Sequence, residues 1–148
     1  MKKTRIKRKS PIRRKSKSER AILTDKLDEV CGQITKITFG HICQKCLKEV
    51  HGRNAHASHV YAKGVGASWR RFDLLNLKLL CYHCHRQWWH KEPMIAKPWF
   101  AKKFPVRAKY LDKKYGDQSA HPITTAEMRE LLEERKEKLE LLQSEMME

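Results

Sequence analysis

The chain has 148 residues, of which 40% are hydrophobic and 34% charged, a size that suits one domain with appended segments and excludes two full domains. Its formal net charge of +16 indicates a polyanionic partner, and nucleic acid is the first candidate. The sequence has neither a run of about 18 apolar residues nor a charged leader followed by an apolar stretch. We therefore expect no membrane-spanning segment, no standard secretion signal and a cytoplasmic location.

Residues 1–20 form a basic arm with eleven Lys or Arg and a single acid, which gives a charge of +10. Such a segment has too little apolar surface to form a core, so we expect it to be disordered. We expect its basic side chains, Arg13 and Arg14 among them, to bind DNA phosphates, with a solubilising tail as the alternative. A membrane-surface role is disfavoured because the arm contains only two isoleucines as aliphatic residues.

A folded domain is expected over residues 21–111, and it begins with a helix over residues 21–39. Apolar residues recur there at three- and four-residue steps, from Ile22 to Ile37. Cys31 lies within this helix and is expected to be a small core residue rather than a ligand.

Two Cys-x-x-Cys pairs follow, Cys43 with Cys46 and Cys81 with Cys84. Four thiolates in two such pairs are the ligand set of a closed tetrahedral zinc site. Paired cysteines with one left over indicate a reducing compartment and a metal rather than disulfides. The sequence therefore predicts one structural Zn²⁺, which can supply on the order of 10 kcal/mol to the folding of so small a unit.

The segment between the two pairs is expected to form a small hairpin. Residues 43–60 suit a zinc knuckle that leads into a β-hairpin, and Gly64 and Gly66 break the chain into a loop. Residues 76–80 are apolar-rich and suit a strand that enters the second pair. A helix is expected from His85 onward, ending before the next proline.

A further short helix is expected from Pro98 to Phe104, because proline is tolerated in a first turn and Pro105 then closes the helix. The aromatic residues of these helices recur at helical spacing. We expect them to pack in the core, with base stacking as the alternative: Trp88, Trp89, Trp99, Phe100 and Phe104.

Residues 112–148 are expected to form a linker and a C-terminal amphipathic helix. Thr124, followed three residues later by Glu127, is the pattern of a capping box that opens this helix. Residues 125–148 carry eight Glu against four Lys or Arg, which gives a charge of −4. The part between the arm and this helix therefore stays strongly basic.

Three residues inside this framework are candidates for catalysis: His59, Asn76 and His85. His59 is the candidate general base for phosphodiester hydrolysis, because an imidazole with a pKa near neutrality can take a proton from water. A surface histidine is the alternative. Asn76 would hydrogen-bond the base or the backbone and fix the active-site loop. His85 is the candidate ligand of a catalytic Mg²⁺ or Mn²⁺, which would stabilise charge on the phosphate and the leaving oxygen.

One histidine is a thin ligand set for a catalytic metal. His56 is the candidate second ligand, and His90 is a weaker one because five residues along an α-helix turn it about 140° from His85. His83 is a minor alternative to a cysteine at the zinc. Three basic side chains around the glycine loop are expected to bind DNA phosphates: Lys63, Arg70 and Arg71. For the two arginines, a solvated basic turn is the alternative.

The order of Cys43-x-x-Cys46, HASHV and RRFDLLNLKLLCYHCH resembles the HNH superfamily, and more narrowly the phage recombination endonucleases of the NinG (Rap) type. The resemblance covers about residues 40–90. It implies an α+β fold with a zinc-stapled ββα-metal (His-Me finger) core and flanking helices. It also implies His59 as the general base, Asn76 as the middle asparagine and His85 as the last, metal-binding histidine.

We therefore expect a metal-dependent DNA endonuclease that acts on branched recombination intermediates of a phage, in the host cytoplasm. We also consider that it pairs as a homodimer. Two alternatives remain open. One is a sequence-specific HNH enzyme of the restriction or packaging-associated kind, and the other is a non-catalytic zinc module that binds nucleic acid.

Overall fold

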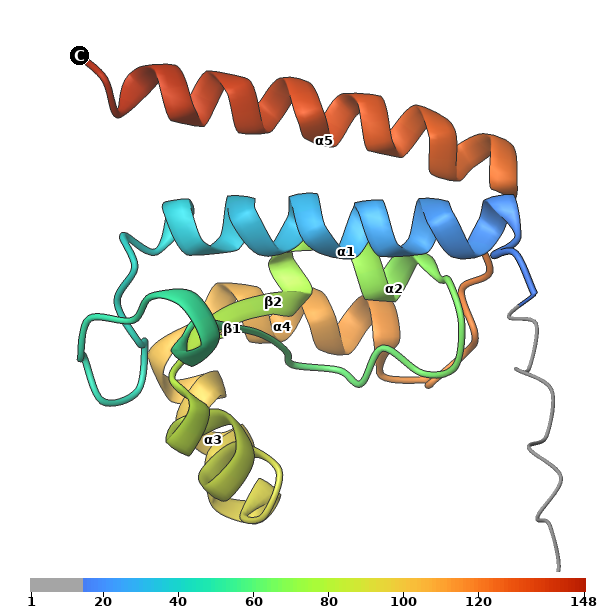
Figure 1. Ribbon diagram of the computed structural model, residues 1–148. Helices are drawn as coiled ribbons and strands as arrows, with labels where there is room; N and C mark the ends of the chain where they lie inside the picture. Colours follow the sequence, from blue (N-terminus) through green and yellow to red (C-terminus); the bar gives the residue numbers. More distant parts are fainter. Residues whose placement is uncertain (1–14) are drawn as a thin grey trace, which may run out of the picture.

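The computed structural model describes residues 15–148, and the chain is α+β, mostly helical with one two-stranded antiparallel sheet (Figure 1). The expected disorder of the arm and the roles of Arg13 and Arg14 lie outside the described residues. No helix over residues 15–148 combines the length and the apolar character that a membrane crossing needs. The elements follow in this order: α1 (Glu19–Thr38), η1 (Gly52–Asn54), β1 (His56–His59), α2 (Trp69–Phe72), η2 (Leu74–Asn76), β2 (Leu77–Leu80), η3 (His83–Trp89), α3 (Pro93–Lys103), α4 (Pro105–Tyr115) and α5 (Thr125–Glu145).

The two long helices, α1 and α5, lie side by side along one edge of the molecule (Figure 1). The side chain of Ser18 caps α1, and the predicted capping box of Thr124 and Glu127 opens α5. Both helix predictions are confirmed. The apolar faces of the two helices form one cluster, the helical cluster, together with Phe72, Leu77 and Ile123: Leu23, Leu27, Val30, Cys31, Ile34, Met128, Leu131 and Leu132. Cys31 is thus a core residue, as predicted.

The sheet and the following helices enclose a second cluster, the cysteine-side cluster. Strands β1 and β2 pair with Ser58 opposite Lys78 and His59 opposite Leu77. All four residues of β2 are buried, so the strand is covered on both faces. The cluster also contains Trp89, Phe100 and parts of α4, and its partly buried rim includes three further aromatic side chains: Trp88, Trp99 and Phe104. The predicted core packing of the aromatic residues is therefore confirmed in full for two of them and in part for three.

Two helix boundaries differ from the prediction. The helix expected from Pro98 already begins at Pro93, and Pro98 lies inside it, because the burial of Ala96 and Phe100 on its inner face holds the helix together across the missing N–H. The end of this helix agrees with the prediction, because α3 ends at Lys103, just before Pro105, which in turn opens α4. Helix α4 runs on to Tyr115, into the stretch expected to be a linker, because this side chain is fully buried.

Candidate functional site

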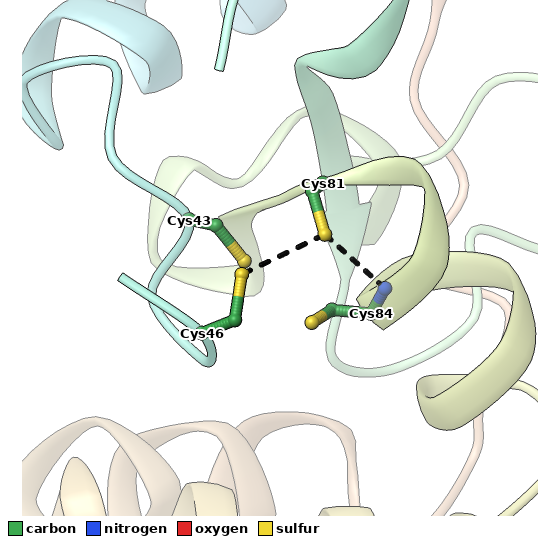
Figure 2. A group of neighbouring side chains, drawn as sticks. All are labelled: Cys43, Cys46, Cys81 and Cys84. Carbon is green, nitrogen blue, oxygen red and sulfur yellow. Dashed lines mark hydrogen bonds between the residues drawn. The ribbon is translucent and has the colours of Figure 1, made fainter. Parts of the chain in front are cut away.

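The four paired cysteines converge at the junction of three segments. Cys43 and Cys46 lie in the turn after α1, Cys81 follows β2, and Cys84 lies in the first turn of η3. Figure 2 shows their side chains turned toward one another. The four sulfur atoms all lie within 4.8 Å of one another, and those of Cys46 and Cys81 are 3.8 Å apart. A tetrahedral zinc with Zn–S bonds of about 2.3 Å has its sulfurs about 3.8 Å apart. The cluster can therefore hold a structural metal such as zinc.

The thiols of this cluster differ in acidity. Burial raises the pKa of the Cys43 thiol, but backbone N–H groups in its surroundings outweigh this effect and lower the pKa to about 7. Burial and the neighbouring thiols Cys81 and Cys43 raise the pKa of Cys84 far above its usual value. A divalent cation must therefore displace protons when it binds, and its affinity falls as the pH falls.

A groove of about 660 Å³ lies between the end of β1 and the helix η3. Its lining includes three histidines and three basic side chains: His59, His85, His90, Lys63, Arg86 and Lys97. None of the described lining residues is Asp or Glu. The described lining of the groove is thus positively charged, with imidazoles as the candidate proton acceptors and metal ligands.

His59, the last residue of β1, faces this groove with a fixed ring orientation. Its Nε2 lies 2.9 Å from the backbone oxygen of Arg71. A carbonyl oxygen only accepts hydrogen bonds, so Nε2 must carry the proton, and in the neutral ring Nδ1 has the free lone pair. Burial lowers the pKa of His59. The ring is therefore neutral at neutral pH, as a proton acceptor needs to be.

The helix η3, which contains Cys84, is a π-helix, and this changes which histidine rings lie side by side. In η3 the backbone N–H of His90 bonds to the oxygen of His85, five residues earlier. The Nε2 atoms of these two rings are 2.9 Å apart. The expectation that His90 points away from His85 is therefore wrong, because it assumed the angle per residue of an α-helix.

His56 lies behind His85, on the side away from His90. Its Nδ1 is 3.0 Å from Nδ1 of His85, while its Nε2 is 2.9 Å from the backbone oxygen of Arg53. The carbonyl again requires a proton on Nε2, so neutral His56 accepts a hydrogen bond from Nδ1 of His85. Burial, with His90 and His56 nearby, lowers the pKa of His85 to about 3. His85 is therefore neutral, with its Nε2 lone pair on the groove side.

This arrangement tests which residues fit a second metal. Two nitrogens bound at about 2.1 Å to one ion at a right angle lie about 3.0 Å apart. Both pairs have this separation: Nε2 of His85 with Nε2 of His90 at 2.9 Å, and Nδ1 of His85 with Nδ1 of His56 at 3.0 Å. The two pairs differ in where they lie: His85 and His90 both line the groove, whereas His56 contacts the opposite nitrogen of His85 and is absent from the groove lining. His56 instead has the position of an outer hydrogen-bond partner that orients a ligand.

Asn76 is fully buried beside the loop that follows β1, residues 60–68, which we call the groove loop. Its Oδ1 accepts a hydrogen bond from the backbone N–H of Tyr61 at 2.8 Å, and its Nδ2 donates to the backbone oxygens of Tyr61 and Arg70 at 2.9 and 3.0 Å. The backbone oxygen of Asn76 accepts a further bond from Val60. Asn76 thus fastens both ends of the loop that follows β1.

The basic residues predicted to bind phosphates have different surroundings. Lys63 lines the groove. The guanidinium of Arg71 is held by Asp28, with Nε–Oδ1 at 2.9 Å and Nη2–Oδ2 at 2.5 Å, and it also donates to Gly66. Its side chain is only 13% exposed, so it braces the loop against α1. The Nε atom of Arg70 is buried without a hydrogen-bond partner among the described residues.

Sequence reasoning missed three basic residues. Arg86 and Lys97 line the groove but stand in helices without a motif, so no signal distinguishes them from other surface charges. Lys78 is fully buried in β2. A signal was present for this residue, because a lysine flanked by leucines on both sides breaks the pattern of a strand that is buried on both faces.

Comparison of the chain with family models, with curated proteins and with solved structures gave no match. The function is therefore inferred from the geometry of the cysteine cluster and the histidine groove.

Proposed function

We propose that this protein is a metal-dependent DNA endonuclease with an HNH-type ββα-metal site, and that it acts on branched recombination intermediates of a phage. The observation that carries the proposal is that His59 from β1, His85 from η3 and His90, which directly follows η3, line one basic groove. The cysteine cluster supports it, because a zinc bound there would tie the strand to the helix that carries these two histidines.

His59 is the proposed general base. Its Nδ1 would take a proton from the water that attacks phosphorus, while the bond from Nε2 to Arg71 holds the ring in the required tautomer. The lowered pKa of His59 keeps this nitrogen unprotonated at neutral pH. Asn76 would keep the loop after β1 closed around the base.

His85 and His90 are the proposed ligands of the catalytic divalent cation, in place of the pair of His85 and His56. When bound, the cation supplies Lewis-acid stabilisation of charge on the phosphate and the leaving oxygen. Because both ligands are imidazoles and no carboxylate lines the described groove, we expect Mn²⁺ to support activity better than Mg²⁺. His56 would orient His85 from behind.

The basic side chains of the groove are the proposed phosphate contacts. Lys63, Arg86 and Lys97 line it. Arg71 is left out of this set because its guanidinium is already paired with Asp28. The arm would add further contacts outside the groove. The preference for branched DNA rests on the resemblance alone.

The test is incubation with a four-way junction, a flap and a linear duplex, each with Mn²⁺, with Mg²⁺ and with neither. His59→Ala should bind DNA and slow cleavage by about 10²–10⁴-fold. His85→Ala and His90→Ala should each raise the Mn²⁺ concentration needed for activity. His51→Ala is the matched control, because its ring is exposed and absent from the groove lining, and it should cleave like the wild type.

Each alternative function has a distinct outcome in this test. Binding of DNA without cleavage at any metal would leave a non-catalytic zinc module. Cleavage of the linear duplex at one sequence, with the junction no better, would support an enzyme of the restriction or packaging-associated kind. Full activity of His59→Ala would remove the nuclease assignment of this motif.

A further inference from the structure

Lys78 stands in the middle of β2 and is 0% exposed. Its ammonium has no carboxylate partner among the ion pairs of residues 15–148. Its Nζ donates to Oγ of Ser58 and to the backbone oxygen of His59, both at 3.1 Å, and lies 3.2 Å from the centre of the Trp89 ring. The three N–H groups therefore have two oxygen acceptors and one aromatic face.

These contacts are a poor way to stabilise a core. Taking an ammonium out of water without a counter-ion is costly, and an unbranched apolar side chain of similar length would fill the same space without that cost. Burial, with Arg107 nearby, lowers the pKa of Lys78 well below its usual value, which reports the same cost. A lysine at such a position indicates a role other than stability.

The contacts of Lys78 join the two elements that carry the groove histidines. The His59 carbonyl lies at the end of β1, where the chain leaves the sheet for the groove loop. Trp89 is the last residue of η3 and directly precedes His90. A single Nζ therefore bonds to the backbone of the proposed base and packs on the helix of the proposed metal ligands.

We propose that Lys78 is a positioning residue for His59, which ties the end of β1 to η3 and so fixes the base relative to His85 and His90. The proposal rests on the assignment of His59 as the base. The ring of His59 is anchored by Arg71 and its backbone by Lys78, so both parts of the residue are held. Both bonds of Lys78 are hydrogen bonds that an amine or an ammonium can donate.

In its protonated form, Lys78 also acts on the pKa of the His59 ring. Burial is the main reason for the lowered pKa of His59, and the Arg71 carbonyl raises it. Of the charged groups that face the ring, Lys63 and Lys78 lower the pKa and Asp28 raises it. Removing the ammonium of Lys78 should therefore raise the pKa of His59.

The experiment compares Lys78→Met with Leu80→Met, in the full chain with zinc bound. Leu80 is on the same face of β2 and fully buried, so its replacement tests repacking without a polar contact. The readouts are zinc content, thermal melting, the titration of the His59 ring by NMR, and the single-turnover rate of cleavage with Mn²⁺.

For Lys78→Met we expect unchanged zinc, a melting temperature no lower than that of the wild type, a raised pKa of His59 and cleavage slowed by about tenfold to a hundredfold. Leu80→Met should leave the His59 titration and the rate unchanged. Loss of activity in step with a fall in melting temperature, or wild-type cleavage with an unchanged His59 titration, would overturn the proposal.

Two further outcomes are distinguishable. If Lys78→Met fails to fold, Ser58→Ala removes one of the two acceptors and should slow cleavage without loss of zinc; an unchanged rate would count against the proposal. If the wild type cleaves no DNA, the proposed function fails. The NMR titration of His59 in Lys78→Met then still decides whether Lys78 controls this ring.

Discussion

Replacing Asn76 by alanine tests the proposed role of this residue as the fastener of the groove loop. The change removes three buried hydrogen bonds, two to the backbone of Tyr61 and one to that of Arg70. At a net value of about 1 kcal/mol each, their loss costs about 3 kcal/mol. Backbone groups that remain buried without a hydrogen-bond partner after the change add to this cost. About 3 kcal/mol is therefore the lower end of the expected loss in unfolding free energy.

Asn76→Asp keeps the acceptor and replaces both N–H donors with oxygen. A carboxylate would then face the two backbone oxygens, which disfavours its charged form and raises its pKa in the folded state. The stability that such a group contributes is fully present below its unfolded pKa of about 3.9 and is lost as the pH rises through the folded value. The variant should therefore be least stable at neutral pH and recover partly on acidification.

Urea denaturation followed by tryptophan fluorescence, with zinc present, measures these losses, and exchange of the Tyr61 amide reports local opening of the loop. Asn54→Ala is the control, because the exposed Asn54 accepts a single bond, from the Tyr82 amide at 2.9 Å. It should cost no more than about 1 kcal/mol. A loss below that value in Asn76→Ala, or the same pH dependence in both Asn76 variants, would refute the reasoning.

Three further predictions concern the zinc, the base and the arm. Cys81→Ser should lose the bound zinc and stability on the order of 10 kcal/mol, whereas Cys31→Ser, which lies outside the cluster, should retain zinc in metal analysis. Because burial lowers the pKa of His59, the acid limb of the pH–rate profile should lie below about 6.5, and a limb above that value would contradict the assignment. Deleting residues 1–14, which leaves the Ser18 cap intact, should flatten the salt dependence of DNA binding by about 0.9 log units for each phosphate that the arm neutralises, whereas an unchanged slope would indicate a solubilising tail.

The parts of the fold that were predictable from sequence depend on short-range rules. The helix of residues 21–39 and the capping box at Thr124 follow from apolar spacing and from hydrogen bonds three residues apart. The cysteine cluster follows from the chemistry of four thiols in two pairs, which leaves few other arrangements.

The missed parts depend on tertiary packing. Helix α3 starts at Pro93 because Ala96 and Phe100 are buried, and no local pattern shows that burial. The contact of His85 with His90 needs a π-helix, which is rare and has no sequence signature that we could use. The sequence thus predicted the residue types of the candidate site and the presence of His59 in it. It did not predict that the ring of His90 lies beside that of His85.

The sharing of one cluster by the first and last helices has a consequence for synthesis of the chain. The apolar face of α1, from Leu23 to Ile34, is covered largely by α5. The ribosome makes residues 125–145 long after α1, so this face stays exposed to solvent and to other chains in the meantime. The cysteine-side cluster is drawn from residues 43–115 and can close earlier, especially once zinc binds. Folding on the ribosome would then run from the metal centre outward, with the long helical pair formed last.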